Sequence, residues 1–204
     1  MAIIRGSNGA DELVGDRDGV PEADTISGLA GDDLLVALGG DDRLDGGFDS
    51  DRLDGGTGDD ILLGGPENDS LFGRDGNDFV RGDVGRDFLA GYAGADAFFF
   101  GDVGFGPVEY ESGVGKGNRD RVTDFSRAQG DKIDVSEMDA DLTAVGQQAF
   151  GFVGEEVPGT GELGFFESAG STIVRGNTDA DTAAEFEIQL DGVGLGLTAS
   201  DFLV

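Results

Sequence analysis

Apolar side chains return at every ninth position through the first half of the chain, and an aspartate stands two residues before each of them. The register starts with Asp11 and Leu13 and then runs without a gap from residue 19 to residue 99. Six residues rich in Gly and Asp favour a tight turn. The next three, with the apolar residue in the middle, favour a very short β-strand with one side chain facing inward. The pattern predicts alternating turns and strands.

Stacking of these units predicts the fold. Two nine-residue units complete one coil with a strand on each side, and successive coils stack the strands into two parallel sheets with the apolar side chains between them. Turns fall alternately on two edges, so each turn lies against the turn eighteen residues later, with Asp33 near Asp51 and Asp42 near Asp60. We expect an all-β protein, a parallel β-roll that continues into a β-sandwich-like C-terminal segment.

Two residue types recur in the turns and are the candidate metal ligands. The sixth position of all ten units is aspartate: Asp11, Asp24, Asp33, Asp42, Asp51, Asp60, Asp69, Asp78, Asp87 and Asp96. Glycines at the first, second and fourth positions are the candidate donors of main-chain carbonyls: Gly28, Gly31, Gly40, Gly46, Gly47, Gly55, Gly56, Gly58, Gly64, Gly65, Gly73, Gly76, Gly82, Gly85, Gly91 and Gly94. Units 6–14 and 19–99 form the array.

Facing aspartates at this spacing repel one another unless a cation lies between them. Carboxylate and carbonyl oxygens at this density suit Ca²⁺, which takes six to eight oxygen ligands, better than Mg²⁺ or Zn²⁺. We expect several bound Ca²⁺ ions, about five to eight. The turns that carry Glu22 and Glu67 at the fourth position, each after a proline, are expected to be distorted or empty.

The amino-acid composition excludes several classes of function. The chain has no Cys and no His, so a disulfide framework, a Cys/His zinc site and a His-based catalytic triad are excluded. The formal net charge of -30 argues against nucleic acid or an anionic membrane as a partner. No stretch approaches the ~20 apolar residues of a membrane span.

The nine-residue motif resembles the RTX, or hemolysin-type, calcium-binding repeat, G-G-x-G-x-D-x-U-x, where U is a large apolar residue. After residue 100 the period stops, and the segments DRVTDF (120–125), GDKIDVS (130–136), AFGFVG (149–154) and AEFEIQLDG (184–192) resemble the C-terminal domain of serralysin-type secreted metalloproteases. The resemblance covers nearly the whole chain. It implies a calcium-loaded β-roll at 1–100 and a β-rich domain at 101–204.

That resemblance also implies a route of export. The ending Asp201-Phe202-Leu203-Val204 resembles the family's uncleaved type I secretion signal, and the N-terminus shows no cleavable signal peptide. The resemblance therefore implies a secreted, extracellular protein that meets the type I secretion apparatus through Asp201–Val204. The proteases' H-E-x-x-H zinc helix cannot exist without His, so we expect no protease activity and no enzyme.

Other functions stay open at this point. The chain is alternatively an accessory module of a larger secreted enzyme, of the metalloprotease or mannuronan epimerase type, or a surface adhesin whose protein or polysaccharide partner no residue identifies. A carboxylate-only enzyme acting on polysaccharide is a weaker alternative, since surface acidity explains pairs such as Glu155 and Glu156 better. Asp131 and Asp134 either cap the last ion of the roll or serve as a turn residue and a strand-edge charge.

Overall fold

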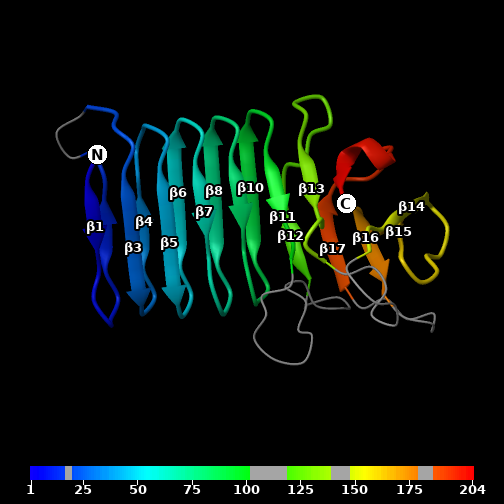
Figure 1. Cartoon of the computed structure of the whole chain (residues 1–204), viewed down its shortest axis with the longest axis horizontal. Helices are drawn as coiled ribbons and strands as arrows, with labels where there is room; N and C mark the ends of the chain where they lie inside the picture. The colour runs from blue at the N-terminus through cyan, green and yellow to red at the C-terminus, as the bar shows by residue number, and fades with distance from the viewer. Residues whose placement is uncertain (17–19, 102–118, 139–147, 179–185) are drawn as a thin grey trace.

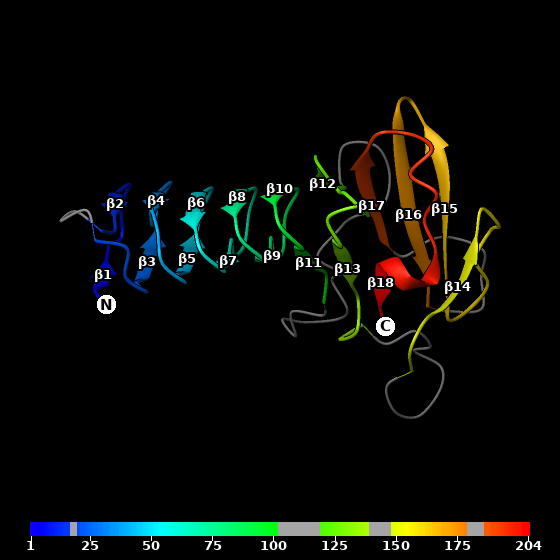
Figure 2. The same ribbon diagram turned by 90° about the horizontal axis from the view of Figure 1, so that it is seen from above.

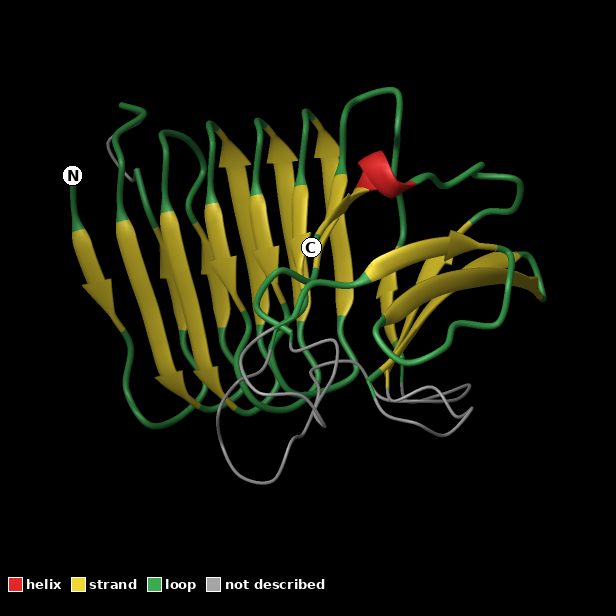
Figure 3. Ribbon diagram, turned by 45° about the vertical axis from the view of Figure 1, so that its right-hand side comes forward, coloured by secondary structure: helices red, strands yellow, loops and turns green. Residues whose placement is uncertain are grey.

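The protein is described by a computed structural model, which describes residues 1–16, 20–101, 119–138, 148–178 and 186–204. The coils lie side by side along the long axis, with turns at both edges (Figure 1). Strands and loops account for nearly all of the described chain, and the one short helix lies close to the C-terminus (Figure 3).

Two sheets form the molecule, and the all-β parallel roll expected from the sequence is confirmed. One sheet has eight strands in the order β1-β3-β5-β7-β9-β11-β13-β18, and the other has ten in the order β14-β15-β16-β17-β12-β10-β8-β6-β4-β2. The elements are β1 (Ile3–Arg5), β2 (Glu12–Val14), β3 (Thr25–Ala30), β4 (Leu34–Val36), β5 (Arg43–Phe48), β6 (Arg52–Thr57), β7 (Ile61–Leu63), β8 (Ser70–Asp75), β9 (Phe79–Arg81), β10 (Phe88–Ala93), β11 (Ala97–Phe99), β12 (Asp120–Val122), β13 (Lys132–Asp134), β14 (Gly151–Gly154), β15 (Glu162–Ser168), β16 (Ser171–Asn177), β17 (Phe186–Asp191), the 3₁₀ helix η1 (Ala199–Asp201) and β18 (Phe202–Leu203).

The eighth position of each unit forms the core between the two sheets. Nine of these side chains are fully buried and Leu13, at the N-terminal end, is 9% exposed. They stack in register through the parallel ladder, as Leu44 on Leu62 and Leu53 on Leu71 show. Each unit contributes one large core side chain, so the interior is one layer made of two rows of side chains, one row from each sheet.

Several strands are longer than the sequence predicts. β3, β5, β6, β8 and β10 run for six residues each because the first turn positions also join the ladder. For example, the Gly47 N–H donates to the carbonyl of Gly64 at 3.1 Å and the Gly64 N–H to that of Arg81 at 2.9 Å. The turn backbones are therefore held at the spacing of a parallel sheet.

The C-terminal strands extend both sheets of the roll. β12 pairs with β10 so that Val122 lies beside Leu89, and β13 pairs with β11 so that Ile133 lies beside Phe98. β17 follows β12 in parallel, and β15 to β17 form an antiparallel meander at that end of the molecule (Figure 2). No helix among the described residues is long and apolar enough to span a membrane.

Arginine side chains stacked on aromatic rings cover part of the outer face of the ten-stranded sheet. The Arg52 guanidinium lies 4.1 Å from the centre of the Phe72 ring, and Arg74 lies 4.7 Å from that of Tyr92. Arg74 also forms an ion pair with Asp54 at 2.6 Å. Because of these contacts Phe72 is only 7% exposed although its strand position faces outward.

Candidate metal centre

The turns have one repeated backbone shape. Positions two and four take positive φ along the array, which suits glycine, yet Leu38 (φ 78°), Arg74 (φ 89°) and Tyr92 (φ 69°) adopt it at position two. Glu67 at position four has φ 82°, and the corresponding Gly31 has φ 106°. The shape is therefore set by the stacked ladder and not by glycine alone.

The position-six aspartates form a ladder along each edge. From Asp24 to Asp78, the backbone N–H of each of these aspartates donates to Oδ1 of the aspartate eighteen residues later, at 2.6 Å from Asp24 to Asp42, 2.8 Å from Asp42 to Asp60 and 2.9 Å from Asp60 to Asp78. The other edge repeats the pattern, with 2.8 Å from Asp33 to Asp51. The sequence-based pairing of turns eighteen residues apart is confirmed.

The second oxygen of these carboxylates has no partner. Oδ2 is buried and accepts no hydrogen bond in Asp33, Asp42, Asp51, Asp60, Asp69, Asp78, Asp87 and Asp96. These side chains are between 96% and 99% buried. A buried, unpaired carboxylate oxygen is strongly unfavourable, so its repetition along both edges points to a positive ligand that binds there.

Carbonyl oxygens converge on the same places. A Cβ placed on Gly46 would collide with Asp51 Oδ2 and lie 2.7 Å from the Gly64 carbonyl oxygen. A Cβ on Gly55 would likewise collide with Asp60 Oδ2 and lie 2.9 Å from the Gly73 carbonyl oxygen. We call this space the cradle: the position-one glycine, Oδ2 of its own turn and the position-one carbonyl of the next coil. Its all-oxygen donor set fits Ca²⁺.

Two candidate aspartates lack the free oxygen. Asp11 Oδ2 accepts hydrogen bonds from the Ser7 N–H at 2.6 Å and the Ser7 hydroxyl at 2.9 Å. Asp24 Oδ2 accepts the Asp16 N–H at 3.3 Å. Among the ten predicted ligands, these two are therefore already satisfied by the protein. Asp24 belongs to the Glu22 turn that the sequence predicts to be distorted, whereas Asp69 in the Glu67 turn keeps its unpartnered oxygen.

A second side-chain ladder, which the sequence analysis missed, runs along position five. Asp59 N–H donates to Asp41 Oδ1 at 3.0 Å, Asn77 N–H to Asp59 Oδ1 at 2.7 Å and Ala95 N–H to Asn77 Oδ1 at 2.9 Å. This ladder runs in the opposite direction to that of position six and is exposed. Both Asp and Asn side chains act as acceptors at position five. The ladder therefore requires a side-chain oxygen and does not require a negative charge. The repeated Asp or Asn at position five is the sequence feature from which this ladder could have been predicted.

The ladder also continues past the nonapeptides through two aspartates. Asp87 N–H donates to Asp120 Oδ1 at 2.8 Å and Asp96 N–H to Asp131 Oδ1 at 3.2 Å. The sequence signal was present: residues 115–123 read GKGNRDRVT and residues 126–134 read SRAQGDKID, with Asp sixth and an apolar residue eighth. Asp120 was missed, and Asp131 does cap an array turn. Asp134 lies on β13 and accepts the Ser136 N–H at 3.0 Å.

Burial raises the pKa of the ladder aspartates. In the ion-free fold, burial raises the pKa of Asp42 and Asp78 to about 6, and that of Asp51, Asp60 and Asp96 to about 7. Hydrogen bonds from backbone N–H groups oppose this shift and neighbouring aspartates add to it. The pKa of Asp69 rises the most, to about 9. The ion-free ladder therefore holds protons at neutral pH.

We expect calcium binding near pH 6 to 7 to release protons. The raised pKa means that the ion-free fold binds protons more tightly than the unfolded chain, whose aspartates titrate near ~3.9. Without calcium the fold is thus most stable at low pH and loses stability as the pH rises through about 6 to 7. Calorimetric titration in buffers of different ionisation enthalpy measures the released protons, and a heat independent of the buffer would contradict this expectation.

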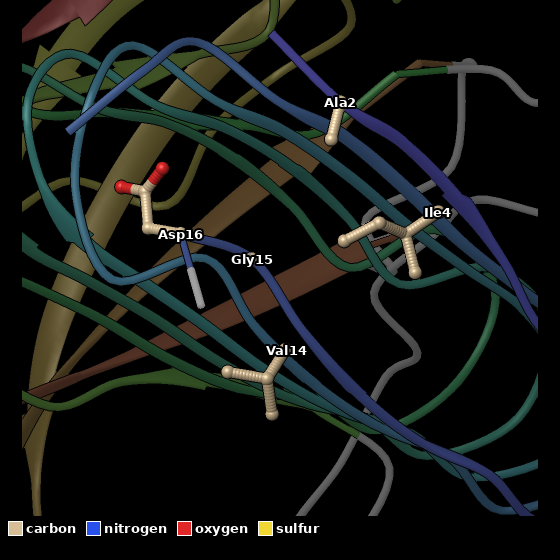
Figure 4. A pocket seen from close by; sticks show the side chains of 5 residues that line it. All are labelled: Ala2, Ile4, Val14, Gly15 and Asp16. Carbon is tan, nitrogen blue, oxygen red and sulfur yellow. The ribbon is translucent and has the colours of Figure 1, made fainter. Parts of the chain in front are cut away.

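Among the described residues, no group of three or more carboxylates has the geometry to hold a metal ion. An ion in the array would therefore be held by few carboxylates and by main-chain carbonyls. A pocket lies at the N-terminal end of the roll, and the described residues that line it are Ala2, Ile4, Val14, Gly15 and Asp16 (Figure 4). Asp16 is the one acidic side chain among these described lining residues.

The family described as RTX calcium-binding nonapeptide repeat (4 copies) matches residues 18–53, 54–89 and 72–102. The repeat array is an RTX array. These RTX repeats account for the period of nine, the cradles and the calcium-binding character of the module. A comparison with curated proteins found no match.

The solved structures that match this chain include two subunits of an epimerase and a lipase. The AlgE6R3 subunit of the Azotobacter vinelandii mannuronan C5-epimerase is 28% identical, with a TM-score of 0.52 over 76% of this chain and 77% of that chain. The AlgE6R2 subunit of the same epimerase is 26% identical, with a TM-score of 0.41 over 98% and 91%. The extracellular lipase LipA from Serratia marcescens is 15% identical, with a TM-score of 0.34 over 98% of this chain and 39% of the lipase.

A methyl group placed in one cradle should prevent one calcium ion from binding. In Gly55→Ala the new methyl group would occupy the space beside Asp60 Oδ2, and the φ of Gly55 is not in the left-handed region. Gly9→Ala is the matched control because a Cβ there meets nothing within 4 Å. Native mass spectrometry in calcium should count one ion fewer for Gly55→Ala and no change for Gly9→Ala. Equal counts for both would show that the cradle is not the site.

Proposed function

We propose that this protein is a secreted, non-catalytic RTX protein that folds outside the cell when Ca²⁺ ions enter the cradles between its coils. The observation that carries the proposal is the row of buried Oδ2 atoms without partners at Asp33 to Asp96. Five cradles between two turns of the array have glycine at position one, those of Asp33, Asp51, Asp60, Asp69 and Asp78, whereas Ala37 already places a methyl group at position one of the Asp42 turn. We propose at least one ion in each.

In this proposal the chain's own residues make folding depend on the ion. The net charge of -30 and the facing aspartates oppose compaction when calcium is scarce. When calcium is present, Oδ2 of one turn and the carbonyl of the next coil bind the same ion, which supplies the positive charge that the buried carboxylates need. The unfolded chain offers no such cradle, so binding energy becomes folding energy. Extracellular calcium modules have affinities of ~10⁻⁴ to 10⁻³ M, which suits a switch that acts after export.

The C-terminal tail supports the proposed export route. β18 pairs in parallel with β13, Phe202 is 6% exposed, and Asp201 is 4% exposed and forms an ion pair with Arg127 at 2.8 Å. The first half of the tail is therefore hidden in the folded protein, whereas Leu203 and Val204 are 42% and 48% exposed. In this proposal the type I secretion apparatus reads Asp201–Val204 before calcium folds the chain. We propose a division of labour between a calcium-binding part at 1–100 and a part at 101–204 that carries this signal.

An accessory module of a larger secreted enzyme is the second candidate. The observation that favours it is the likeness to a repeat subunit of a mannuronan C5-epimerase at 28% identity. In that case the roll would fold in the same way and act beside a catalytic domain. A surface adhesin with a protein or polysaccharide partner is the remaining alternative.

Circular dichroism in a calcium chelator and then in millimolar calcium tests the proposed function. We expect a largely unfolded spectrum in chelator and a β-sheet spectrum in calcium, and magnesium at the same concentration should not replace calcium. A chain fully folded in excess chelator would contradict the proposal. Export is tested separately by deleting residues 201–204 in a host with a type I system. Secretion should stop, while refolding of the purified variant in calcium tests the roll.

A further inference from the structure

The first turn of the roll, residues 6–11, contains the one Asn-Gly pair of the sequence, Asn8-Gly9. Asparagine is a chemically labile residue, and a following glycine leaves unshielded the main-chain N–H group that attacks the asparagine side chain. Asn8 and Gly9 are both exposed, and a Cβ placed on Gly9 would meet nothing within 4 Å. Solvent therefore reaches both groups that this reaction joins.

Asn77 shows how the array holds an asparagine. Its Oδ1 accepts the Ala95 N–H at 2.9 Å, and its Nδ2 donates to Asp59 Oδ1 at 3.1 Å. The N–H group that follows it in the chain, that of Asp78, donates to Asp96 Oδ1 at 3.0 Å. The side chain and the next N–H group are both held in ladders, so neither is free to move toward the other.

Asn8 and Gly9 have no such restraint. Among the residues that the structure describes, neither the Asn8 side-chain amide nor the Gly9 N–H group has a hydrogen-bond partner, and the Gly9 carbonyl accepts the Ser7 hydroxyl at 3.2 Å. Asp-Gly is the other labile pair, and in one such pair the Gly76 N–H is held by the Ala93 carbonyl at 2.8 Å. The first turn therefore leaves free the two groups that the array holds.

From these contacts we infer that Asn8-Gly9 is a site of self-modification whose only co-reactant is water. The Gly9 nitrogen loses its proton to solvent base and bonds to Asn8 Cγ, and the side-chain nitrogen leaves as ammonia. Water then opens the resulting succinimide at one of its two carbonyls, which leaves aspartate or isoaspartate in place of Asn8. The inference does not depend on calcium binding.

Isoaspartate loosens the first unit of the roll. Gly9 packs directly on the next turn of its edge, since a Cβ on Gly31 would lie 2.6 Å from the Gly9 carbonyl carbon. The turn is also braced around Asn8, because Asp11 Oδ2 accepts the Ser7 N–H at 2.6 Å. An isoaspartyl link lengthens the main chain by one atom between these two contacts. The longer chain cannot keep both, so β2, which follows the turn, should fray.

Peptide mapping of the full chain aged in calcium buffer tests the site. Mass spectrometry should find Asn8 converted first, and faster at higher pH because the attacking nitrogen must lose its proton, while Asn68 and Asn77 keep their amides. Gly9→Ala is the matched variant: its Cβ has free space and the φ of Gly9 is not in the left-handed region, so the fold is kept. Its methyl group hinders the attack, so conversion should slow severalfold.

Two results would overturn the inference: an Asn8 that keeps its amide as long as Asn77 does, or a Gly9→Ala variant that converts at the rate of the parent. Hydrogen exchange tests the loosening separately. Asn8→Asp adds the charge with a normal main chain and should protect β2 as the parent does, whereas the aged isoaspartyl chain should exchange β2 faster. Equal protection in both would contradict the expected fraying.

Discussion

The triple variant Asp33→Asn, Asp51→Asn and Asp69→Asn should lose three ions and most of the calcium-dependent stabilisation of one edge. Each asparagine keeps the Oδ1 acceptor for its ladder N–H but loses the charge beside the cradle. At a calcium concentration ten times Kd, one ion stabilises the fold by about 1.4 kcal/mol. Three ions therefore contribute about 4 kcal/mol, a large part of a typical stability of about 5 to 15 kcal/mol.

The same variant should behave oppositely in chelator. Removing three buried like charges relieves repulsion in the ion-free fold, so the triple variant should keep more β structure than the parent without calcium. Urea unfolding with and without calcium measures both effects. A matched control neutralises position five: Asp32→Asn, Asp41→Asn and Asp59→Asn change the charge equally, and Asn68 and Asn77 already serve there. If both triples lose the same stability in calcium, net charge and not the cradle is responsible.

Leu53→Ala should destabilise the roll by about 2 to 5 kcal/mol, in calcium as well as in its absence. Leu53 is fully buried and lies in the ladder between Leu35 and Leu71, with one such side chain from each unit. The core is one layer thick, with one row of side chains from each sheet, so few neighbours can move to close the cavity and we expect the upper part of this range. Thermal unfolding in saturating calcium measures the loss.

Leu38→Ala is the control for the core variant. Leu38 is 48% exposed at position two of a neighbouring turn. Its φ of 78° is as unfavourable for alanine as for leucine, so the substitution does not change the backbone strain. Its effect should stay within about 0.5 kcal/mol. Equal losses at Leu38 and Leu53 would mean that the sequence register does not define the core.

Most of the fold could be predicted from the nine-residue period of the sequence. An aspartate and an apolar residue two positions apart, repeated without a gap, determine the strand order, the inward face and the pairing of turns eighteen residues apart. This is because units of one fixed length, each with a single inward side chain, stack in parallel in only one register. The cradle's aspartates and glycines were found for the same reason.

The features that the sequence did not reveal depend on contacts between segments that break the period. Asp120 and Asp131 are displaced from the period of nine by inserts, so the sequence shows the motif around each aspartate, and the pairing with Asp87 and Asp96 shows its place in the ladder. The loss of the free oxygen in Asp24 depends on the Asp16 backbone, which comes from the irregular insert after the first unit. The six-residue strands and the position-five ladder arise from stacking, which no single unit displays.

Counting the calcium ions on the folded chain by native mass spectrometry tests the central claim most directly. The buried, unpartnered oxygens of Asp33, Asp51, Asp60, Asp69 and Asp78 beside position-one glycines predict five ions within the array. A chain that is folded in calcium and carries about five ions agrees with this account. A folded chain that carries none would contradict it, since the buried carboxylates would then be stabilised by something other than calcium.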